Sequence, residues 1–94
     1  MMELVQELSL LDNDVLYLFT VNNVRLQGDF AEFDLTIQTS SQILSRWSIT
    51  CGHCLKAYIE RTNLAREVTI KYDIFIVGNS YFSGSYFKAT RLTI

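Results

Sequence analysis

The chain has 94 residues, a length that favours a single domain, residues 1–94, built around one small core. Hydrophobic residues make up 49% of the sequence. A body of this size cannot hide so many apolar groups, so some of them should face a partner or a second copy of the chain. The net charge of −2 gives no sign of a polyanionic ligand, and we do not expect nucleic acid as a partner.

Charge is distributed unevenly along the chain. Residues 1–45 contain seven acidic side chains and one arginine, whereas residues 46–94 contain seven basic side chains and three acidic ones. Ion pairs between neighbouring strands would account for this pattern. A basic face for an anionic ligand is the alternative.

The sequence predicts neither a targeting signal nor a membrane span. Its first residues, MMELVQELS, are acidic and lack the basic start of a secretory signal. The longest apolar run, Val15 to Phe19, is far shorter than a membrane span. Two cysteines without a secretory signal indicate a reducing compartment, so we expect a cytoplasmic protein.

The N-terminal segment is compatible with one short helix. Leu4, Leu8 and Leu11 are spaced as on one face of a helix over residues 3–11. The turn-forming run Asp12-Asn13-Asp14 would end it.

The next segments predict strands. The β-branched and aromatic run Val15–Val21 favours a central strand, followed by a hairpin turn at Asn22-Asn23 and a returning strand over 24–27. After a turn at Gly28-Asp29, residues 30–39 alternate strictly between apolar and polar side chains, as in a half-buried strand. The predicted core side of that strand consists of Ala31, Phe33, Leu35 and Ile37.

The stretch from Arg46 to Glu60, which follows a polar loop at 39–42, has the longest regular alternation. Its predicted core positions are Trp47, Ile49, Cys51, His53, Leu55, Ala57 and Ile59. A straight strand of this length would exceed the width of so small a domain, so we expect a bend at Gly52. A helix over 55–66 is the competing interpretation of the second half.

The C-terminal third predicts a long hairpin. Residues 68–77 alternate, and Gly78-Asn79 suits a two-residue turn that pairs 67–77 with 80–94 and sets Ile70 opposite Phe87. With a loop at Thr62-Asn63, no proline and at least five strand signals, the sequence predicts an all-β fold. We expect an antiparallel sheet forming a small sandwich or partial barrel, with at most one short helix.

Cys51-Gly52-His53-Cys54 is the one motif with candidate chemistry. It resembles the redox tetrapeptide of the protein disulfide isomerase branch of the thioredoxin superfamily, which would imply a reactive first thiol at a helix N-terminus. The chain lacks the proline that this family places beside its disulfide. A metal site is another interpretation, with Cys51, Cys54 and His53 as candidate zinc ligands completed across a two-fold axis.

A structural role is our preferred interpretation of this motif. Cys51 and His53 fall on the predicted core face, and Cys54 is expected to be a surface or edge thiol. The carboxylates of Glu32 and Asp34 share the polar side of one strand, where we expect them to be solvated. Nothing else in the sequence forms a catalytic set, so we expect neither an enzyme nor a cofactor.

The last hairpin is the predicted interaction surface. Its candidate interface residues are Phe75, Val77, Tyr81, Phe82 and Tyr86. We therefore expect a non-catalytic, cytoplasmic β domain that acts through protein–protein contacts, either as a homodimer or with another protein. The alternative is a thiol-dependent redox or zinc-binding protein that uses Cys51 and Cys54.

Overall fold

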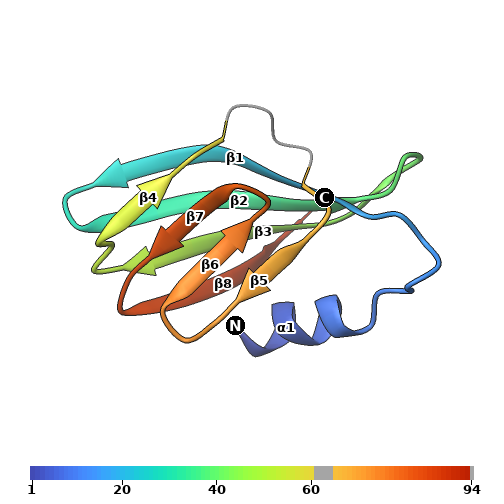
Figure 1. The fold of residues 1–94 in the computed structure, drawn as a ribbon, viewed down its shortest axis with the longest axis horizontal. Helices are drawn as coiled ribbons and strands as arrows, with labels where there is room; N and C mark the ends of the chain where they lie inside the picture. The colour runs from blue at the N-terminus through green and yellow to red at the C-terminus, as the bar shows by residue number, and fades with distance from the viewer. Residues whose placement is uncertain (61–64, 94) are drawn as a thin grey trace.

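The computed structural model describes residues 1–60 and 65–93. These residues form one short helix followed by eight strands (Figure 1). The elements are α1 (Met2–Ser9), β1 (Leu18–Gln27), β2 (Phe30–Gln38), β3 (Ile43–Gly52), β4 (Lys56–Tyr58), β5 (Val68–Ile70), β6 (Ile74–Val77), β7 (Ser80–Ser83) and β8 (Tyr86–Leu92).

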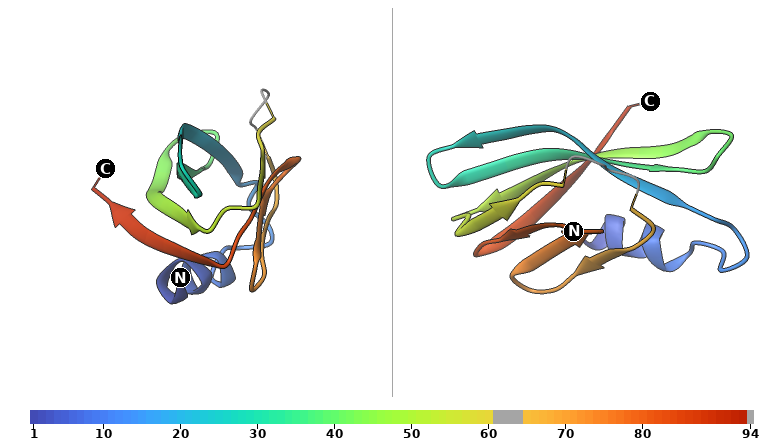
Figure 2. Two further views of the ribbon diagram at one scale, coloured as in Figure 1. Left: turned by 90° about the vertical axis from the view of Figure 1, so that its left-hand side faces the viewer. Right: turned by 45° about the horizontal axis from the view of Figure 1, so that its top comes forward.

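The strands form two antiparallel sheets of four strands each. Sheet one has the order β1-β2-β3-β8, and sheet two has the order β4-β7-β6-β5. Sheet one curves around the core and sheet two faces it, with α1 at the rim formed by β8 and β5 (Figure 2). The prediction of an antiparallel all-β fold with one short helix is confirmed, and the two sheets do not close into a barrel. Within the described ranges, no helix is long and apolar enough to cross a membrane.

The core lies between the sheets and is centred on Phe33 of β2. Its ring stacks on Phe82 of β7 with the centroids 4.0 Å apart, and it meets the edge of Phe75 of β6 at 5.4 Å. All three side chains are fully buried. Burial of each phenyl group contributes about 1.5–3 kcal/mol, so this contact is a main source of cohesion between the sheets.

The predicted alternation is confirmed in β2 and β3. The buried positions that face the core are Ala31, Phe33, Leu35 and Ile37 on β2, and Ser45, Trp47, Ile49 and Cys51 on β3. On β2, Asp34 and Thr36 between them are also buried, at 6% exposure each. Each of the four on β2 lies opposite one of those on β3 in the antiparallel register. The two strands therefore present one continuous inner face to sheet two and α1.

The prediction for the first strand is partly wrong. Val15–Val21 was expected to be a central strand, but β1 begins later and lies at the edge of sheet one. The expected turn at Asn22-Asn23 is a β-bulge, where the register with β2 shifts, so residues 24–27 continue the strand. Asn23 has a φ of 53°, which asparagine tolerates, but here the conformation kinks the strand without reversing it. The chain reverses at Gly28-Asp29, as predicted.

The chain passes between the sheets at two tight corners. The predicted bend at Gly52 is confirmed, and His53, at a φ of 48°, leads from β3 into β4. The segment around Gly84 leads from β7 back to β8, and Ser85 N–H donates a hydrogen bond to Gly52 O at 2.8 Å. A Cβ at position 84 would lie 2.6 Å from Gly52 O and closer still to Cys51 Sγ. Only glycine fits where the two corners meet.

The predicted hairpin between residues 67–77 and 80–94 is wrong in its outer part. The turn at Gly78-Asn79 is confirmed and joins β6 to β7. Residues 71–73 break the expected long strand, so β5 folds back and pairs with β6. β8 leaves sheet two and pairs with β3. This arrangement lets both sheets contribute to one core, which a single protruding hairpin could not do.

The second half of the Arg46–Glu60 stretch also differs from its prediction. The expected core positions beyond the corner are exposed, namely His53, Leu55, Ala57 and Ile59. The alternation identifies the buried side chains only as far as Cys51. The chain changes sheets at Gly52, and beyond this corner the odd-numbered side chains no longer point into the core.

Lys56–Tyr58 forms a strand, so the competing helix over 55–66 is wrong over its described part. Residues 61–64, which include the loop predicted at Thr62-Asn63, lie outside the described residues.

The carboxylate of Glu7 links α1 to β3 and β8. Glu7 accepts hydrogen bonds from Ser45 Oγ, from Trp47 Nε1 at 3.2 Å and from Arg91 Nη1 at 2.6 Å. Partial burial raises the pKa of Glu7, but the three hydrogen bonds and the charge of Arg91 outweigh burial and lower the pKa below its usual value near 4.5. Folding therefore favours the ionised form of Glu7. Leu4, one turn earlier on the helix, is fully buried.

Replacing Glu7 tests this attachment. We expect Glu7→Gln to lower the free energy of unfolding by about 1–3 kcal/mol at pH 7, because charge-assisted hydrogen bonds are lost. A lowered carboxyl pKa contributes stability above its unfolded value, and that contribution is lost as the pH falls through the folded value. Urea titrations at pH 7 and below pH 4 should therefore show the difference between wild type and variant shrinking in acid. A difference that does not depend on pH would contradict this assignment.

The two corner glycines form a matched pair. Gly84→Ala should destabilise the fold by about 1–3 kcal/mol, because the new methyl group meets backbone and a buried sulfur. Gly52→Ala should cost less, because the atoms nearest to its Cβ are the outer ring and hydroxyl of Tyr86, an exposed side chain that can turn away. Thermal unfolding of both variants measures the difference, and equal losses would argue against the packing described.

Candidate functional site

The two cysteines lie on either side of the first corner. Cys51 ends the buried face of β3 and has no exposed surface, which confirms the predicted core position. Cys54 is half-buried, and its thiol donates a hydrogen bond to the carbonyl of Lys56 at 3.4 Å. Both cysteines are free thiols. Desolvation, together with the neighbouring Cys54, raises the pKa of the Cys51 thiol to about 12.

His53 does not lie on the core face as predicted. Its side chain is 65% exposed, and its Nδ1 forms a 2.8 Å contact with an oxygen of Asp29 from the β1–β2 turn. The ring also stacks on Phe30 with centroids 6.4 Å apart. The left-handed conformation at His53 turns its side chain outward at the corner, so the residue joins two turns rather than filling the interior.

The arrangement of this motif favours a structural role. A redox-active thiol needs a lowered pKa, whereas burial raises that of Cys51. His53 contacts Asp29 rather than forming a ligand set with the thiols. Across residues 1–60 and 65–93, no group of three or more His, Cys, Asp and Glu side chains is arranged to hold a metal ion.

Substitution of the two cysteines separates their roles. Cys51→Ser should lower the free energy of unfolding by about 1–3 kcal/mol, because it places a hydroxyl in a sealed apolar site. Cys54→Ser should have a smaller effect, because Cys54 retains contact with solvent. In the folded wild type, iodoacetamide should label Cys54 and spare Cys51, which mass spectrometry of the digested protein can show. Equal labelling of both thiols would contradict the buried position of Cys51.

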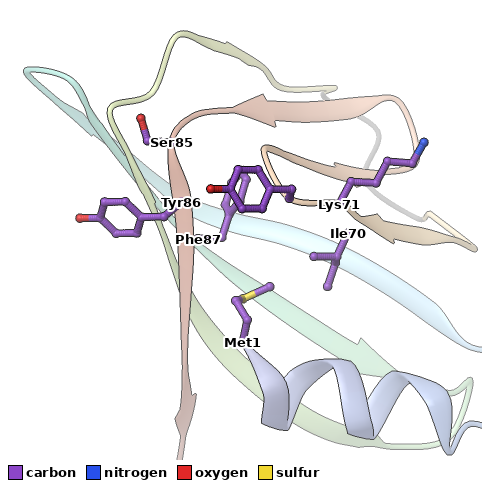
Figure 3. A pocket seen from close by; sticks show the side chains of 7 residues that line it. Met1, Ile70, Lys71, Ser85, Tyr86 and Phe87 are labelled. Atoms are coloured by element: carbon purple, nitrogen blue, oxygen red, sulfur yellow. The ribbon is translucent and has the colours of Figure 1, made fainter.

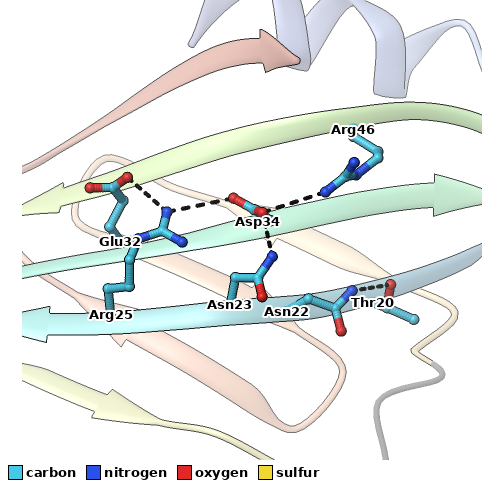
Figure 4. A network of polar contacts seen from close by, with 7 residues as sticks. All are labelled: Thr20, Asn22, Asn23, Arg25, Glu32, Asp34 and Arg46. Atoms are coloured by element: carbon cyan, nitrogen blue, oxygen red, sulfur yellow. Dashed lines mark hydrogen bonds and ion pairs between the residues drawn. The ribbon is translucent and has the colours of Figure 1, made fainter. Parts of the chain in front are cut away.

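A charged network lies on the outer face of sheet one (Figure 4). Asp34 on β2 is only 6% exposed and interacts with Asn23 at 2.9 Å and with Arg25 and Arg46 at 3.6 Å each. Arg25 also pairs with Glu32 at 2.7 Å. The prediction that Glu32 and Asp34 are a solvated pair is therefore wrong for Asp34, which is covered by side chains from the two neighbouring strands, β1 and β3.

Ion pairing accounts for part of the uneven charge in the sequence. Asp34 and Glu7 from the acidic half pair with Arg46 and Arg91 from the other half. These contacts join distant parts of the chain. They favour the cross-strand explanation of the charge pattern over a basic face for an anionic ligand.

A cavity of about 270 Å³ opens between β8, β5 and the start of the chain (Figure 3). Its wall includes Met1, Ile70 and Phe87. The Lys71 ammonium and the Tyr86 hydroxyl extend toward opposite sides of the view, so they do not converge on a common point (Figure 3). Met1, Ile70 and Phe87 thus give the cavity an apolar wall, and the hydroxyl-bearing residues Tyr72 and Ser85 complete its lining.

The structure separates the five predicted interface residues. Phe75, Val77 and Phe82 belong to the core, with exposed fractions of 4% or less, so their predicted place on the surface is wrong. Tyr81 and Tyr86 are exposed. The prediction placed Phe75 and Val77 on the outer face of this strand, whereas they face the core. The sequence does not distinguish the two faces here, because both are apolar.

The outer face of sheet two carries an exposed row of side chains, which we call the tyrosine row. It consists of Tyr58, Tyr81, Ile76 and Thr69, which lie side by side across the four strands. The rings of Tyr58 and Tyr81 stack with centroids 6.0 Å apart and are 50% and 38% exposed. Tyr58 was not among the predicted interface residues. The signal was present, because Tyr58 lies on the opposite side of the Arg46–Glu60 stretch from its predicted core positions.

Comparisons of the chain with models of protein families, with curated proteins and with solved structures gave no match.

Proposed function

We propose that this protein is a non-catalytic interaction domain that forms a homodimer through the β4 end of sheet two, where Tyr58 and Tyr81 lie on the outer face. The observation that carries the proposal is the stacked and exposed pair Tyr58 and Tyr81. Tyrosine rings offer a large contact area with few rotatable bonds and are enriched where protein interfaces have their strongest contacts.

The surroundings of the pair support this proposal. Ile76 continues the row on β6, and Ile59, which follows β4, is 38% exposed. Leu55, which precedes β4, is 80% exposed. Apolar side chains are thus exposed both beside the rings and along the same end of sheet two, as expected of a surface that meets another protein.

The roles of the reactive side chains also support a non-catalytic function. Glu7 and Asp34 are held in hydrogen-bonded networks that join elements of the fold. Cys51 fills the core, and His53 bridges two turns. We propose a cytoplasmic location as well, because the two cysteines are compatible with a reducing compartment.

Sedimentation of the purified chain tests the proposed dimer. We expect a dimer at low micromolar concentration, and the double variant Tyr58→Ser/Tyr81→Ser should dissociate at least about tenfold more readily. Tyr72→Ser is the matched control, because Tyr72 is 91% exposed and lies outside the tyrosine row. Circular dichroism should show that all variants remain folded. A monomeric wild type, or equal weakening by the control, would refute the proposed interface.

A further inference from the structure

We infer that two copies of this chain join edge to edge through β4. The two β4 strands run antiparallel about a two-fold axis centred on Tyr58, and the two copies of sheet two form one continuous sheet. This inference rests on the proposed dimer and specifies its geometry. The occupant of the β4 edge is thus a second copy of the same chain.

β4 has one edge that pairs with no other described strand of sheet two. The strand lies at the end of sheet two and pairs only with β7. All three of its residues, Lys56–Tyr58, are exposed. β4 is short and carries a lysine, which limit edge pairing, but it has no bulge or proline, so its free side can still pair with another strand.

The other edge strands are better protected. β1 carries the bulge at Asn22-Asn23, and the backbone of Phe19 exchanges two hydrogen bonds with Ala65, at 2.8 and 3.0 Å. β8 lies beside α1, which is bonded to it through Arg91 and Glu7. On β5, two of the three side chains are half-buried. Among the described edges, β4 is thus the most exposed.

The charge pattern around Tyr58 is self-complementary. Lys56 lies two residues before it and Glu60 two residues after it. β4 ends at Tyr58, so the proposed pairing extends the strand by two residues. In an antiparallel pair centred on Tyr58, Lys56 then lies opposite the partner's Glu60, and the symmetry creates this pair twice. Within one chain, the Glu60 carboxylate accepts a hydrogen bond from the hydroxyl of Tyr58 at 3.4 Å. Opposite charges on directly paired residues of neighbouring strands are stabilising.

Other registers lack this match. A centre at position 56 would place two lysines opposite each other, and a centre at position 60 would place two glutamates opposite each other. Centres at 57 or 59 would pair one charged residue with a tyrosine. Only the register centred on Tyr58 pairs each charge with its opposite.

Both faces of the proposed β4–β4 pair bring apolar or aromatic side chains together. On the outer face, Tyr58 meets the partner's Tyr58, so the stacked rings of both copies form one aromatic row. On the other face, Ala57 lies opposite the partner's Ile59. Ile59, which is 38% exposed in the single chain, is therefore covered in this arrangement.

A charge-exchange experiment tests the register. Lys56→Glu alone and Glu60→Lys alone should each weaken the dimer by roughly tenfold, because both ion pairs become like-charge contacts. The double variant carrying both changes should recover most of the wild-type affinity. An equal mixture of the two single variants should form heterodimers, because each chain then offers only charges opposite to its partner's. Lys71→Glu, on an exposed residue of the β5–β6 turn, is the matched control and should have no effect.

Cross-linking gives an independent measurement of the same geometry. Tyr58→Cys, on a Cys54→Ser background, should form a covalent dimer under mild oxidation, because directly opposed Cβ atoms lie within reach of a disulfide. Tyr81→Cys on the same background should not. Its two copies would be separated by both β4 strands, about 14 Å at the usual strand spacing.

The outcomes distinguish the geometry from the dimer itself. A wild type that is monomeric in sedimentation refutes both proposals. A stable dimer that responds to the tyrosine substitutions, yet is indifferent to charge exchange and gives no cross-link at position 58, refutes the β4 geometry alone. Recovery in the double variant together with a cross-link at position 58 supports it.

Discussion

The packing of Phe33 between the two sheets is the contact on which this fold depends. The strands of sheet two have only three or four residues each, and the apolar face of this small sheet must be buried against another element. Its inner rings, Phe75 and Phe82, lie against Phe33 and leave no exposed surface on any of the three. Sheet one in turn needs a cover for its curved inner face. Each sheet therefore exists because the other provides an apolar surface.

This mutual dependence requires the chain to pass twice between the sheets, at Gly52 and at Gly84. The corners lie so close together that the Cys51 thiol and the carbonyl of Gly52 fill the space where a side chain at position 84 would be. The Cys51–Cys54 motif, the only one in the sequence with candidate chemistry, is thus placed at this tightly packed crossing. The same corner directs β4 to the edge of sheet two, where Tyr58 and its neighbours face solvent. The proposed contact surface is consequently a product of the crossover.

The candidate site was predictable only in part. Cys51 could be placed in the core because it continues the alternation of an unbroken strand. Asp34 could not be recognised as covered, because its cover comes from Arg25 and Arg46 on the two neighbouring strands. The role of Glu7 was equally hidden, because the groups that bond it are more than thirty residues away in sequence. The local pattern shows which side chains of a strand share a face, but it does not identify the residues that cover that face.

The sequence by itself determined that the chain is an antiparallel β protein, with a half-buried strand over 30–39 and a turn at Gly78-Asn79. Those features depend on side-chain period and turn chemistry, which are local. Tertiary structure decided which face of residues 74–82 is buried, because that run is apolar on both sides and its alternation fits either choice. The fold-back at 71–73 and the return of β8 to sheet one place Phe75 and Phe82 inside and Tyr81 outside. The reason is physical: an apolar side chain is buried wherever the rest of the chain supplies a second surface, and only the assembled fold supplies one.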